Sequence, residues 1–530
     1  MKIKLLLFAA IIFASFTTIS GQDKITLTTE KSLNSYFDFY LEFASNAWID
    51  WNENGIIDAG EELNPGNQFF ELQNQNIILY GDVEYVSFYG CQIKNIDISE
   101  NPVLEALTII ENQVEITNLN LQSNSLASIQ IFDSEVPLLD LSLVPNLANL
   151  SLIGVSSLSS IDLSNSSLYY LQLIALPSLS SINLSNANNL KKLGLIELSH
   201  LSSLDITMLD DLEELSIVDL PSLNSIDISN LNNLTFLELF ELPNITNVDV
   251  SNMENLESFH IGEMPITSID LTKNLYLESL GLYDLPLASL DISKNRELNF
   301  LGIVDIPVNA LDFTNNVNVW ELRLEGLDVE VIDLSALGNL SSLFLRDLSI
   351  KELDLTNNTL LNRLDLTSLE IETLDLSQNI NLEFLYINRS FSGGMPFTSP
   401  AVKDKKIYKD VKNIEIINNL KLKSGGLAKT SKLTSLDLSS NVGLKTLHLE
   451  NMRLDNYDFS KNLILTDLTI QNCALKNIDI SYNTELEYLI LSDNELTSLD
   501  VSSNSKLKYR LNIENNDFDA CALNRIIDDL

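Results

Sequence analysis

The chain has 530 residues and a formal net charge of −42, because 32 Lys and Arg face 74 Asp and Glu. This excess of acids excludes binding of nucleic acid or anionic lipid through a basic face, since phosphates are held by Lys and Arg. Hydrophobic residues make up 45% of the chain, which excludes a disordered protein, and 18 Gly and 12 Pro are too few for collagen-like or low-complexity sequence.

Residues 1–20 have the pattern of a secretory signal peptide. Lys2 and Lys4 precede a short apolar stretch that ends in small residues, and a polar chain follows directly. The apolar stretch is too short for a membrane anchor, and no later segment is apolar for long enough to cross a bilayer. We therefore expect an exported protein, secreted or at the cell surface, without a transmembrane segment.

Residues 21–78 are expected to form a strand-rich module that contains a calcium-type loop. Residues 48–62, WIDWNENGIIDAGEE, fit the spacing D-x-[DN]-x-[DN]-G-x5-E. Alternate residues of such a loop turn oxygen atoms inward, as Ca²⁺ requires, so the pattern predicts a structural Ca²⁺ site. The expected ligands are Asp50, Asn52, Asn54, the carbonyl of Ile56, Asp58 and Glu61. The alternative is an acidic hairpin turn in which Asp and Asn serve only turn geometry.

From residue 79 onward the phrase φ-D-φ-S recurs, where φ is an apolar residue. Its polar position is Asp in sixteen of eighteen cases, and the spacing is 20–23 residues. Each period has two halves in which apolar residues alternate, so each half is expected to form a short strand with apolar side chains inward. One period cannot bury its own apolar residues, but stacked periods can. The sequence therefore predicts a β-rich solenoid with two short parallel strands per repeat, over residues 79–388 and 433–518.

Two phrases, LTSLDLSSN (433–441) and LTSLDVSSN (496–504), identify the type of repeat. They resemble, nearly letter for letter, the LTSLDVSxN repeats of secreted bacterial leucine-rich-repeat proteins of the internalin type. The resemblance implies a leucine-rich-repeat horseshoe that binds its partner on the concave sheet. In the central repeats an apolar residue such as Leu176 or Leu220 stands where the family commonly has Asn. We expect a dry apolar ladder there in place of a hydrogen-bonded one.

The two halves of the repeat differ in their outward positions. These are Asp and mostly Ser or Thr in the φ-D-φ-S half, but they vary in the other half, where the last outward position is apolar in nearly all of ten successive repeats. Soluble proteins rarely expose a long apolar patch without a partner, so we assign binding of a protein or glycan to this half. The alternative is that tilted side chains bury this column. The expected partner-binding residues are Ile110, Phe132, Ile153, Ile174, Ile196, Val218, Phe240, His260, Tyr283, Arg323, Phe344 and Tyr386.

The repeated Asp residues pose a problem, because carboxylates stacked at strand spacing repel one another. We expect each of them to accept hydrogen bonds from N–H groups of its turn or from Ser and Thr hydroxyls. The alternative is a row of bound divalent cations.

The repeat pattern breaks between Asp375 and Asp437. Residues 389–432 contain ten basic residues against three acids and are expected to form an inserted loop or β-excursion around one degraded repeat. This insertion either carries function or is held to the acidic solenoid by charge alone. Residues 519–530 are expected to form a helix that caps the open end. No sorting domain follows, so we expect either a freely secreted protein or a chain that continues beyond residue 530.

These patterns favour a non-catalytic secreted or surface protein that functions in binding and adhesion. An enzyme is not expected, because His200, His260 and His448 fall in different repeats and no Gly-rich phosphate loop joins a strand to a helix. A structural role is the alternative, in which the apolar column of one copy packs against another in a dimer or a surface layer.

Overall fold

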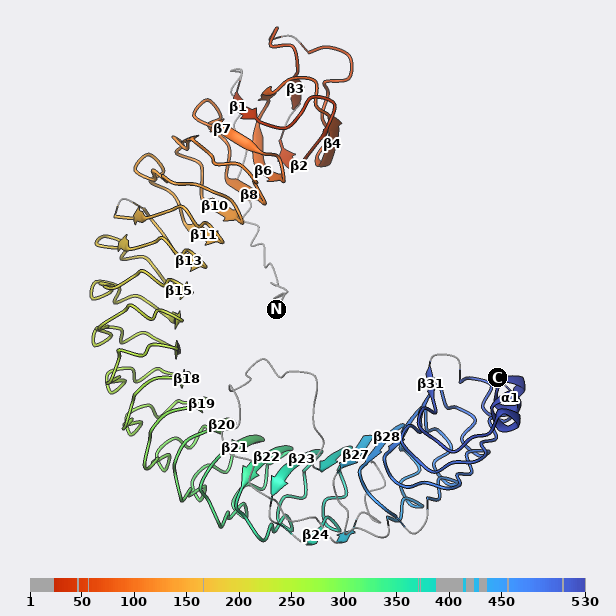
Figure 1. Cartoon of the computed structure of the whole chain (residues 1–530). Helices are drawn as coiled ribbons and strands as arrows, with labels where there is room; N and C mark the ends of the chain where they lie inside the picture. The colour runs from red at the N-terminus through yellow and green to blue at the C-terminus, as the bar shows by residue number, and fades with distance from the viewer. Residues whose placement is uncertain are drawn as a thin grey trace. The chain divides into compact units, whose positions relative to one another are not determined.

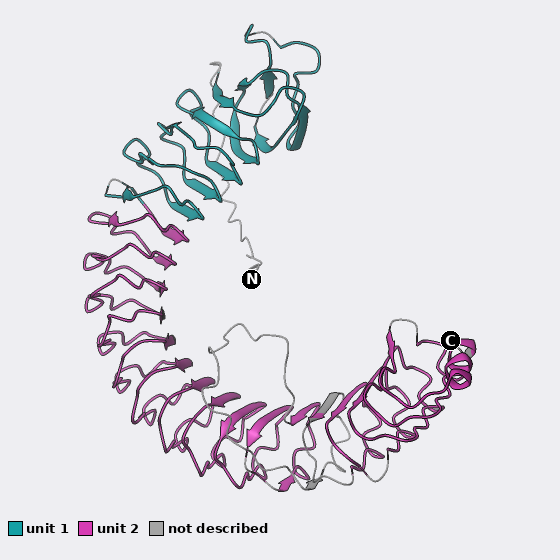
Figure 2. Ribbon diagram, viewed as in Figure 1, with its two compact units in different colours: residues 1–167 teal, residues 168–530 magenta. Residues whose placement is uncertain are grey.

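The computed structural model describes residues 23–44, 47–55, 57–164, 166–369, 371, 373–387, 413–415, 424–428, 436–454, 457–507 and 510–529. The chain forms two compact units, residues 1–167 and residues 168–530 (Figure 2). The expected signal peptide and most of the expected insertion lie outside the described residues.

Unit 1 contains twelve short strands in its described part (Figure 1). They are β1 (Lys24–Thr29), β2 (Tyr36–Phe43), β3 (Trp48–Asp50), β4 (Gly66–Glu71), β5 (Asn76–Tyr80), β6 (Val83–Tyr89), β7 (Ile93–Asp97), β8 (Ala106–Ile110), β9 (Asn118–Asn120), β10 (Ser128–Phe132), β11 (Asn149–Ile153) and β12 (Ser160–Asp162). One sheet has the order β3–β5–β1–β7–β9. In the other, β4, β2 and β6 are antiparallel neighbours, and β6, β8, β10 and β11 continue as parallel neighbours. The expected N-terminal β module therefore shares its second sheet with the first repeats.

Alternation of side chains builds the core of unit 1. On β2, Phe37, Phe39 and Leu41 are buried, whereas Tyr36 is exposed on the opposite face. The rings of Phe37 and Phe39 pack against the ring of Phe88 on β6. The centroid of the Phe88 ring lies 6.3 Å from that of Phe37 and 6.1 Å from that of Phe39. Each buried aromatic side chain contributes roughly 1.5–3 kcal/mol, so this cluster is a main source of stability for the module.

Unit 2 contains a parallel sheet to which successive repeats contribute one short strand each. Its strands are β13 (Tyr170–Ile174), β15 (Lys192–Ile196), β16 (Glu214–Val218), β17 (Phe236–Phe240), β18 (Ser258–Gly262), β19 (Ser279–Tyr283), β20 (Phe300–Val304), β21 (Glu321–Glu325), β22 (Ser342–Leu348), β23 (Arg363–Leu369), β25 (Phe384–Ile387), β27 (Ser424–Ala428), β28 (Thr446–Glu450), β29 (Asp467–Gln471), β30 (Tyr488–Ile490) and β31 (Arg510–Asn512). Within unit 2 this sheet lines the inner, concave side of the curve (Figure 2). The variable half of the repeat therefore lies on the concave side, as expected.

The core of unit 2 consists of apolar ladders in exact repeat register. Leu171 and Leu173 pair with Leu193 and Leu195 of the next repeat, and all four are buried. The expected dry ladder is confirmed, since residues at its positions are at most 3% exposed. They are Leu176, Leu220, Leu242, Met264, Leu285 and Ile306.

The fold class is confirmed, but the second strand of each repeat is mostly absent from the described residues. In the φ-D-φ-S half a strand forms at β7, β9 and β12 in unit 1 and at β14 (Ser181–Asn183) and β24 (Thr373–Asp375) in unit 2, where β24 pairs with β26 (Asn413–Glu415). Elsewhere in the described residues this half forms no strand. The Asp carboxylate accepts the N–H two residues later in both cases, at 2.9 Å from Thr272 to Asp270, where no strand forms, and at 2.8 Å from Ser377 to Asp375, at the end of β24.

The helix α1 (Ala520–Asp529) ends the described chain, as expected for a cap. Asp519 accepts the N–H of Ala522 at 2.8 Å and so satisfies one of the free donors of the first turn. Ile526 is 2% exposed, which shows that the helix buries one apolar face.

Candidate functional site

The predicted binding residues lie on the outward face of the parallel sheets, in register from strand to strand. In unit 1, Phe132 of β10 pairs with Ile110 and Ile153 on its two neighbours. In unit 2 one unbroken column, named here the apolar column, follows the ends of seven strands. It consists of Ile174, Ile196, Val218, Phe240, Gly262, Tyr283 and Val304.

The side chains of these residues are not buried inside the solenoid. Eleven of the twelve predicted binding residues are half-buried, and they alternate with fully buried leucines and isoleucines on the other face. Tyr386 differs, since it is only 8% exposed and lies against the guanidinium of Arg363. Among the described elements, the close contacts of these strands are with the neighbouring strands of the sheet.

Three glycines on the sheet make room for large rings. A Cβ atom at Gly262 would lie 2.6 Å from the ring of Phe240, and one at Gly281 would lie 2.5 Å from the imidazole of His260. Gly302 leaves space beside Phe300 and Tyr283. The rings therefore lie down along the sheet, where Phe240 and Tyr283 meet at 5.5 Å between centroids. Burial lowers the pKa of His260, so this imidazole is held neutral among the rings.

Arginines and aromatic rings alternate across the next strands, an arrangement named here the aromatic–arginine ladder. The guanidinium of Arg323 lies 5.7 Å from the ring of Phe300 and 4.8 Å from that of Phe344. Arg363 lies 5.0 Å from Phe344 and 5.6 Å from Tyr386. Such cation–π contacts hold long side chains in fixed positions and present flat, amphipathic surface to a partner.

A third outward column was missed by the sequence analysis. It consists of the first residue of each strand, and two of its members form an ion pair between Lys192 and Glu214 at 2.7 Å. Phe300 and Arg363, both part of the ladder, also belong to it. The sequence held a signal for this column. The first residue of each strand stands two positions before the middle, variable residue of the strand, and it is large or charged in many repeats.

An acidic column along the edge of the apolar column was also missed. Six successive strands, β15 to β20, are each followed by an acid with φ between 45° and 58°. This left-handed conformation is costly for most residues other than Gly, Asn and Asp, and here three of the six residues are Glu. Burial and the charges of neighbouring acids raise the pKa of Glu241 and of Glu263. We name these residues the acidic turn column: Glu197, Asp219, Glu241, Glu263, Asp284 and Asp305.

The repeated Asp residues accept hydrogen bonds within their own turns, as expected. In fourteen repeats the pKa of this carboxyl is lowered by a hydrogen bond from the residue two positions later. Asp312, for example, accepts both the N–H and the hydroxyl of Thr314, at 2.9 Å and 2.5 Å. These are the turn hydrogen bonds that the sequence predicts for this column.

The predicted calcium ligands converge in the loop after β3. Asp50 is fully buried and accepts the N–H of Gly55 at 2.9 Å, and Glu61, 4% exposed, accepts the N–H of Asp58 at 2.8 Å. The amides of Asn52 and Asn54 lie 2.8 Å and 2.9 Å from one carboxylate oxygen of Asp58.

This donor set fits Ca²⁺ in its chemistry, because it supplies carboxylate and amide oxygens at alternate positions of one loop. Ile56, the expected carbonyl ligand, lies outside the described residues. No three His, Cys, Asp or Glu side chains gather in a metal-binding arrangement in the described part of the chain, so the fit depends on the two Asn side chains as well.

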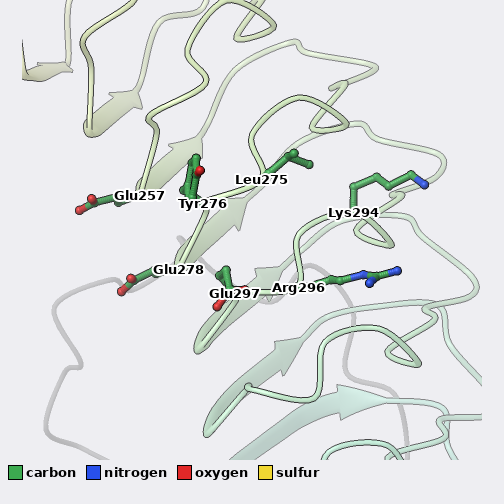
Figure 3. A pocket seen from close by; sticks show the side chains of 7 residues that line it. All are labelled: Glu257, Leu275, Tyr276, Glu278, Lys294, Arg296 and Glu297. Carbon is green, nitrogen blue, oxygen red and sulfur yellow. The ribbon is translucent and has the colours of Figure 1, made fainter.

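A pocket in unit 2 is lined by the turns that lead into β18, β19 and β20 (Figure 3). The described residues that line it include no His or Cys. In Figure 3 the carboxylates and the basic groups extend to opposite sides, so they do not converge on one point. The lining residues are Glu257, Leu275, Tyr276, Glu278, Lys294, Arg296 and Glu297.

The described cysteines and imidazoles belong to different repeats, but two imidazoles contact a serine hydroxyl. His260 Nε2 lies 3.0 Å from Ser279 Oγ, and His200 Nδ1 lies 3.2 Å from Ser199 Oγ. Burial raises the pKa of Cys91 to about 12, which keeps the thiol protonated. His448 faces Glu450 at 3.4 Å within its own strand, while His200 lies in an exposed turn. No arrangement of nucleophile, base and orienting group is present among these residues.

Comparison with solved structures gives the fold. An LRR protein of Leptospira interrogans superposes with a TM-score of 0.51 at 18% sequence identity, over 65% of this chain and 94% of that one. TLR13, in its complex with ssRNA13, superposes with a TM-score of 0.50 at 16% identity, over 80% of this chain and 73% of that one. The chain has a leucine-rich-repeat fold.

Other comparisons give further context for this leucine-rich-repeat chain. The functional domain of InlJ, an internalin of Listeria monocytogenes, is 26% identical over 57% of this chain and 68% of that domain, with a TM-score of 0.46. No protein-family model matches the sequence, and a search of curated proteins gave no match. In the described part of the chain no helix is long and apolar enough to span a membrane.

Proposed function

We propose that this chain is a non-catalytic binding protein, exported by a bacterium to its surface or surroundings, that holds a protein or glycan partner on the concave sheet of unit 2 and serves in adhesion. The observation that carries the proposal is the apolar column, which follows seven strands and is partly exposed at every position except Gly262. At about 4.8 Å between strands, it extends for about 30 Å. A surface of this length suits an extended segment of a partner better than a small molecule.

The chemistry of the neighbouring residues supports a role in recognition. Aromatic and arginine side chains dominate the binding energy of many protein interfaces, and here they are already fixed by cation–π contacts. Arg323 is also held by Glu321 at 2.5 Å. Side chains that are ordered before binding lose little conformational entropy when the partner docks.

The test is to replace Phe240 by Glu and compare capture of surface proteins and glycans by the immobilised mature chain. We expect the variant to lose its specific partners, because a carboxylate in the centre of the apolar column would be desolvated without a counter-charge. Val331→Glu is the matched control, since Val331 is 82% exposed and lies outside the strands. Equal capture by the wild type and by a folded Phe240→Glu variant would contradict the proposal.

Self-association is the second candidate function, and the same apolar column favours it. Light scattering of the mature wild type at micromolar concentration separates the two. A monomer would exclude a stable layer or dimer, whereas an oligomer that dissociates in Phe240→Glu but not in Val331→Glu would identify the apolar column as a contact between copies.

We also propose that the loop of Asp50 to Glu61 binds Ca²⁺ in a structural role. Its support is a loop that carries oxygen ligands at alternate positions and whose two outer carboxylates, Asp50 and Glu61, are buried. A bound cation would offset the charge of these carboxylates and would join β3 to the chain that follows.

Calorimetric titration of the full mature chain with CaCl₂ tests this site. We expect one tight site in the wild type and its loss in Asp50→Asn and Glu61→Gln, each with a lower thermal midpoint in calcium. Glu53→Gln is the control, because Glu53 lies in the same loop but is exposed and at no ligand position. A wild type without calcium heat, or one whose heat persists in both ligand variants, would refute the site.

A further inference from the structure

The second sheet of unit 1 exposes a face of aromatic and acidic side chains on β4, β2 and β6, named here the aromatic–acidic face. Tyr36 is 59% exposed, Phe69 is 63% exposed and Tyr89 is 49% exposed. Large aromatic side chains of this kind are usually buried on folding, and a group of them on one face marks an interaction site. None of these residues is among the predicted binding residues, so the inference does not rest on the proposed function.

The strand register brings the rings together around one carboxylate. Asp38 at the centre of β2 pairs with Phe69 on one neighbouring strand and with Tyr89 on the other. The rings of Tyr36 and Phe69 stack at 4.5 Å between centroids, with 15° between their planes. A stacked pair on a strand is rigid, so this part of the face is a preformed platform.

The other half of the face repeats the combination of rings and acids. Tyr40 and Tyr85 make an edge-to-face contact at 5.6 Å, and the hydroxyl of Tyr40 donates to Glu42 at 2.5 Å. Burial and the charges of Glu105 and Glu42 raise the pKa of Glu84. The acids at this end of the face therefore repel one another in the free protein.

Among the described residues of unit 1, basic side chains are few, and only Lys31 lies at the edge of this face. Residues 23–167 contain twenty-one acids but only three lysines and no arginine, and the sequences of β4, β2, β6 and β8 contain neither Lys nor Arg. Lys24 and Lys94 belong to the other sheet, where they pair with Glu100 at 3.2 Å and Glu30 at 2.6 Å. Lys31 donates to the backbone carbonyl of Tyr36 at 2.8 Å, beside the face.

We propose that the aromatic–acidic face docks a cationic segment of a partner protein, an extended stretch that carries Lys or Arg. Ammonium and guanidinium groups are attracted to the faces of Tyr and Phe rings, and Asp38 and Glu42 would accept their N–H groups. Such a segment would contact both the exposed aromatic rings and the carboxylates of the face. A neutral glycan would use the rings but would leave the carboxylates without a counter-charge, so charge complementarity favours the cationic protein segment.

The experiment measures binding of a fluorescent nine-residue peptide of alternating Lys and Thr to the full mature chain, by anisotropy at about 150 mM salt, where long-range attraction to the acidic body is screened. We expect Tyr36→Ala and Phe69→Ala to weaken binding roughly two- to fivefold each, as the loss of one cation–π contact predicts. Tyr276→Ala is the matched control, because its ring is 63% exposed in unit 2, and we expect it to bind as the wild type does.

Two results would overturn the proposal. Binding that is unchanged in both ring variants would show that the peptide responds only to the bulk charge of the chain. Binding of the matching Gln–Thr peptide or of neutral dextran fragments at equal strength would show that the face selects no cation. Asp38→Asn, which keeps the shape of the side chain, must weaken binding in a chain whose circular dichroism matches that of the wild type. These outcomes are independent of Phe240→Glu, which tests unit 2.

Discussion

Single polar side chains close the turns of this solenoid. Asn316 is buried and donates to the carbonyls of Ile292 at 3.1 Å and Asn295 at 2.9 Å, which belong to the preceding repeat. The same pair of bonds recurs at Asn274, Asn295, Asn358, Asn379, Asn462, Asn483 and Asn504. Because buried carbonyls must be paired, this ladder joins each repeat to the one before it.

Replacement of Asn316 by Ala is expected to lower the free energy of unfolding by about 1–3 kcal/mol, because two buried carbonyls lose their donor. Urea denaturation followed by circular dichroism measures the change. Asn318→Ala is the control, since Asn318 makes one bond, at 3.1 Å to Arg296, on an exposed turn, and we expect a change within about 0.5 kcal/mol. Equal effects of the two substitutions would show that burial of the amide has no special role.

At the scale of elements, alternation of apolar residues was enough to place the strands of the parallel sheet and their outward columns. It was not enough for the other half of the repeat, where the same alternation and the same turn at the Asp occur with a strand, as at Asp375, and without one, as at Asp270. Periodicity states which way a side chain points but not which neighbours lie over it. For that reason the burial of Tyr386 and the contacts of Arg323 and Arg363 with the rings beside them were beyond prediction.

The glycines of β18, β19 and β20 show the same limit more clearly. In the sequence, Gly262 stands in the apolar column without a side chain, and Gly281 and Gly302 do the same at the middle positions of β19 and β20. In the structure these gaps are filled by rings from adjacent positions, because a glycine leaves space that a neighbouring Phe, Tyr or His occupies. A position without a side chain therefore shapes the surface as much as one with a large side chain.

For the whole molecule, the net charge of −42 has two parts with opposite effects on stability. The repeated Asp residues have a lowered pKa in the folded state, so the stability they contribute is present above their unfolded pKa, about 3.9, and is lost as the pH falls below it. The acidic turn column behaves in the opposite way. The pKa of Glu241 and of Glu263 is raised in the folded state. The folded state therefore loses stability as the pH rises from the unfolded pKa of these carboxyls to their raised folded pKa.

Glu241→Gln and Glu263→Gln are therefore expected to stabilise the protein at pH 7, by roughly 0.2–1 kcal/mol each, because they remove like charges on adjacent strands and keep the left-handed backbone unchanged. The gain should vanish near pH 4, where these carboxyls bind protons, and should shrink in about 1 M salt. Thermal unfolding at the two pH values measures it, with Glu254→Gln, an exposed acid in another turn, as the control. A gain that is equal at pH 4 and pH 7 would mean that the column acts through packing. A gain at pH 7 alone would mean that repulsion between these ionised carboxylates lowers the stability of the folded chain.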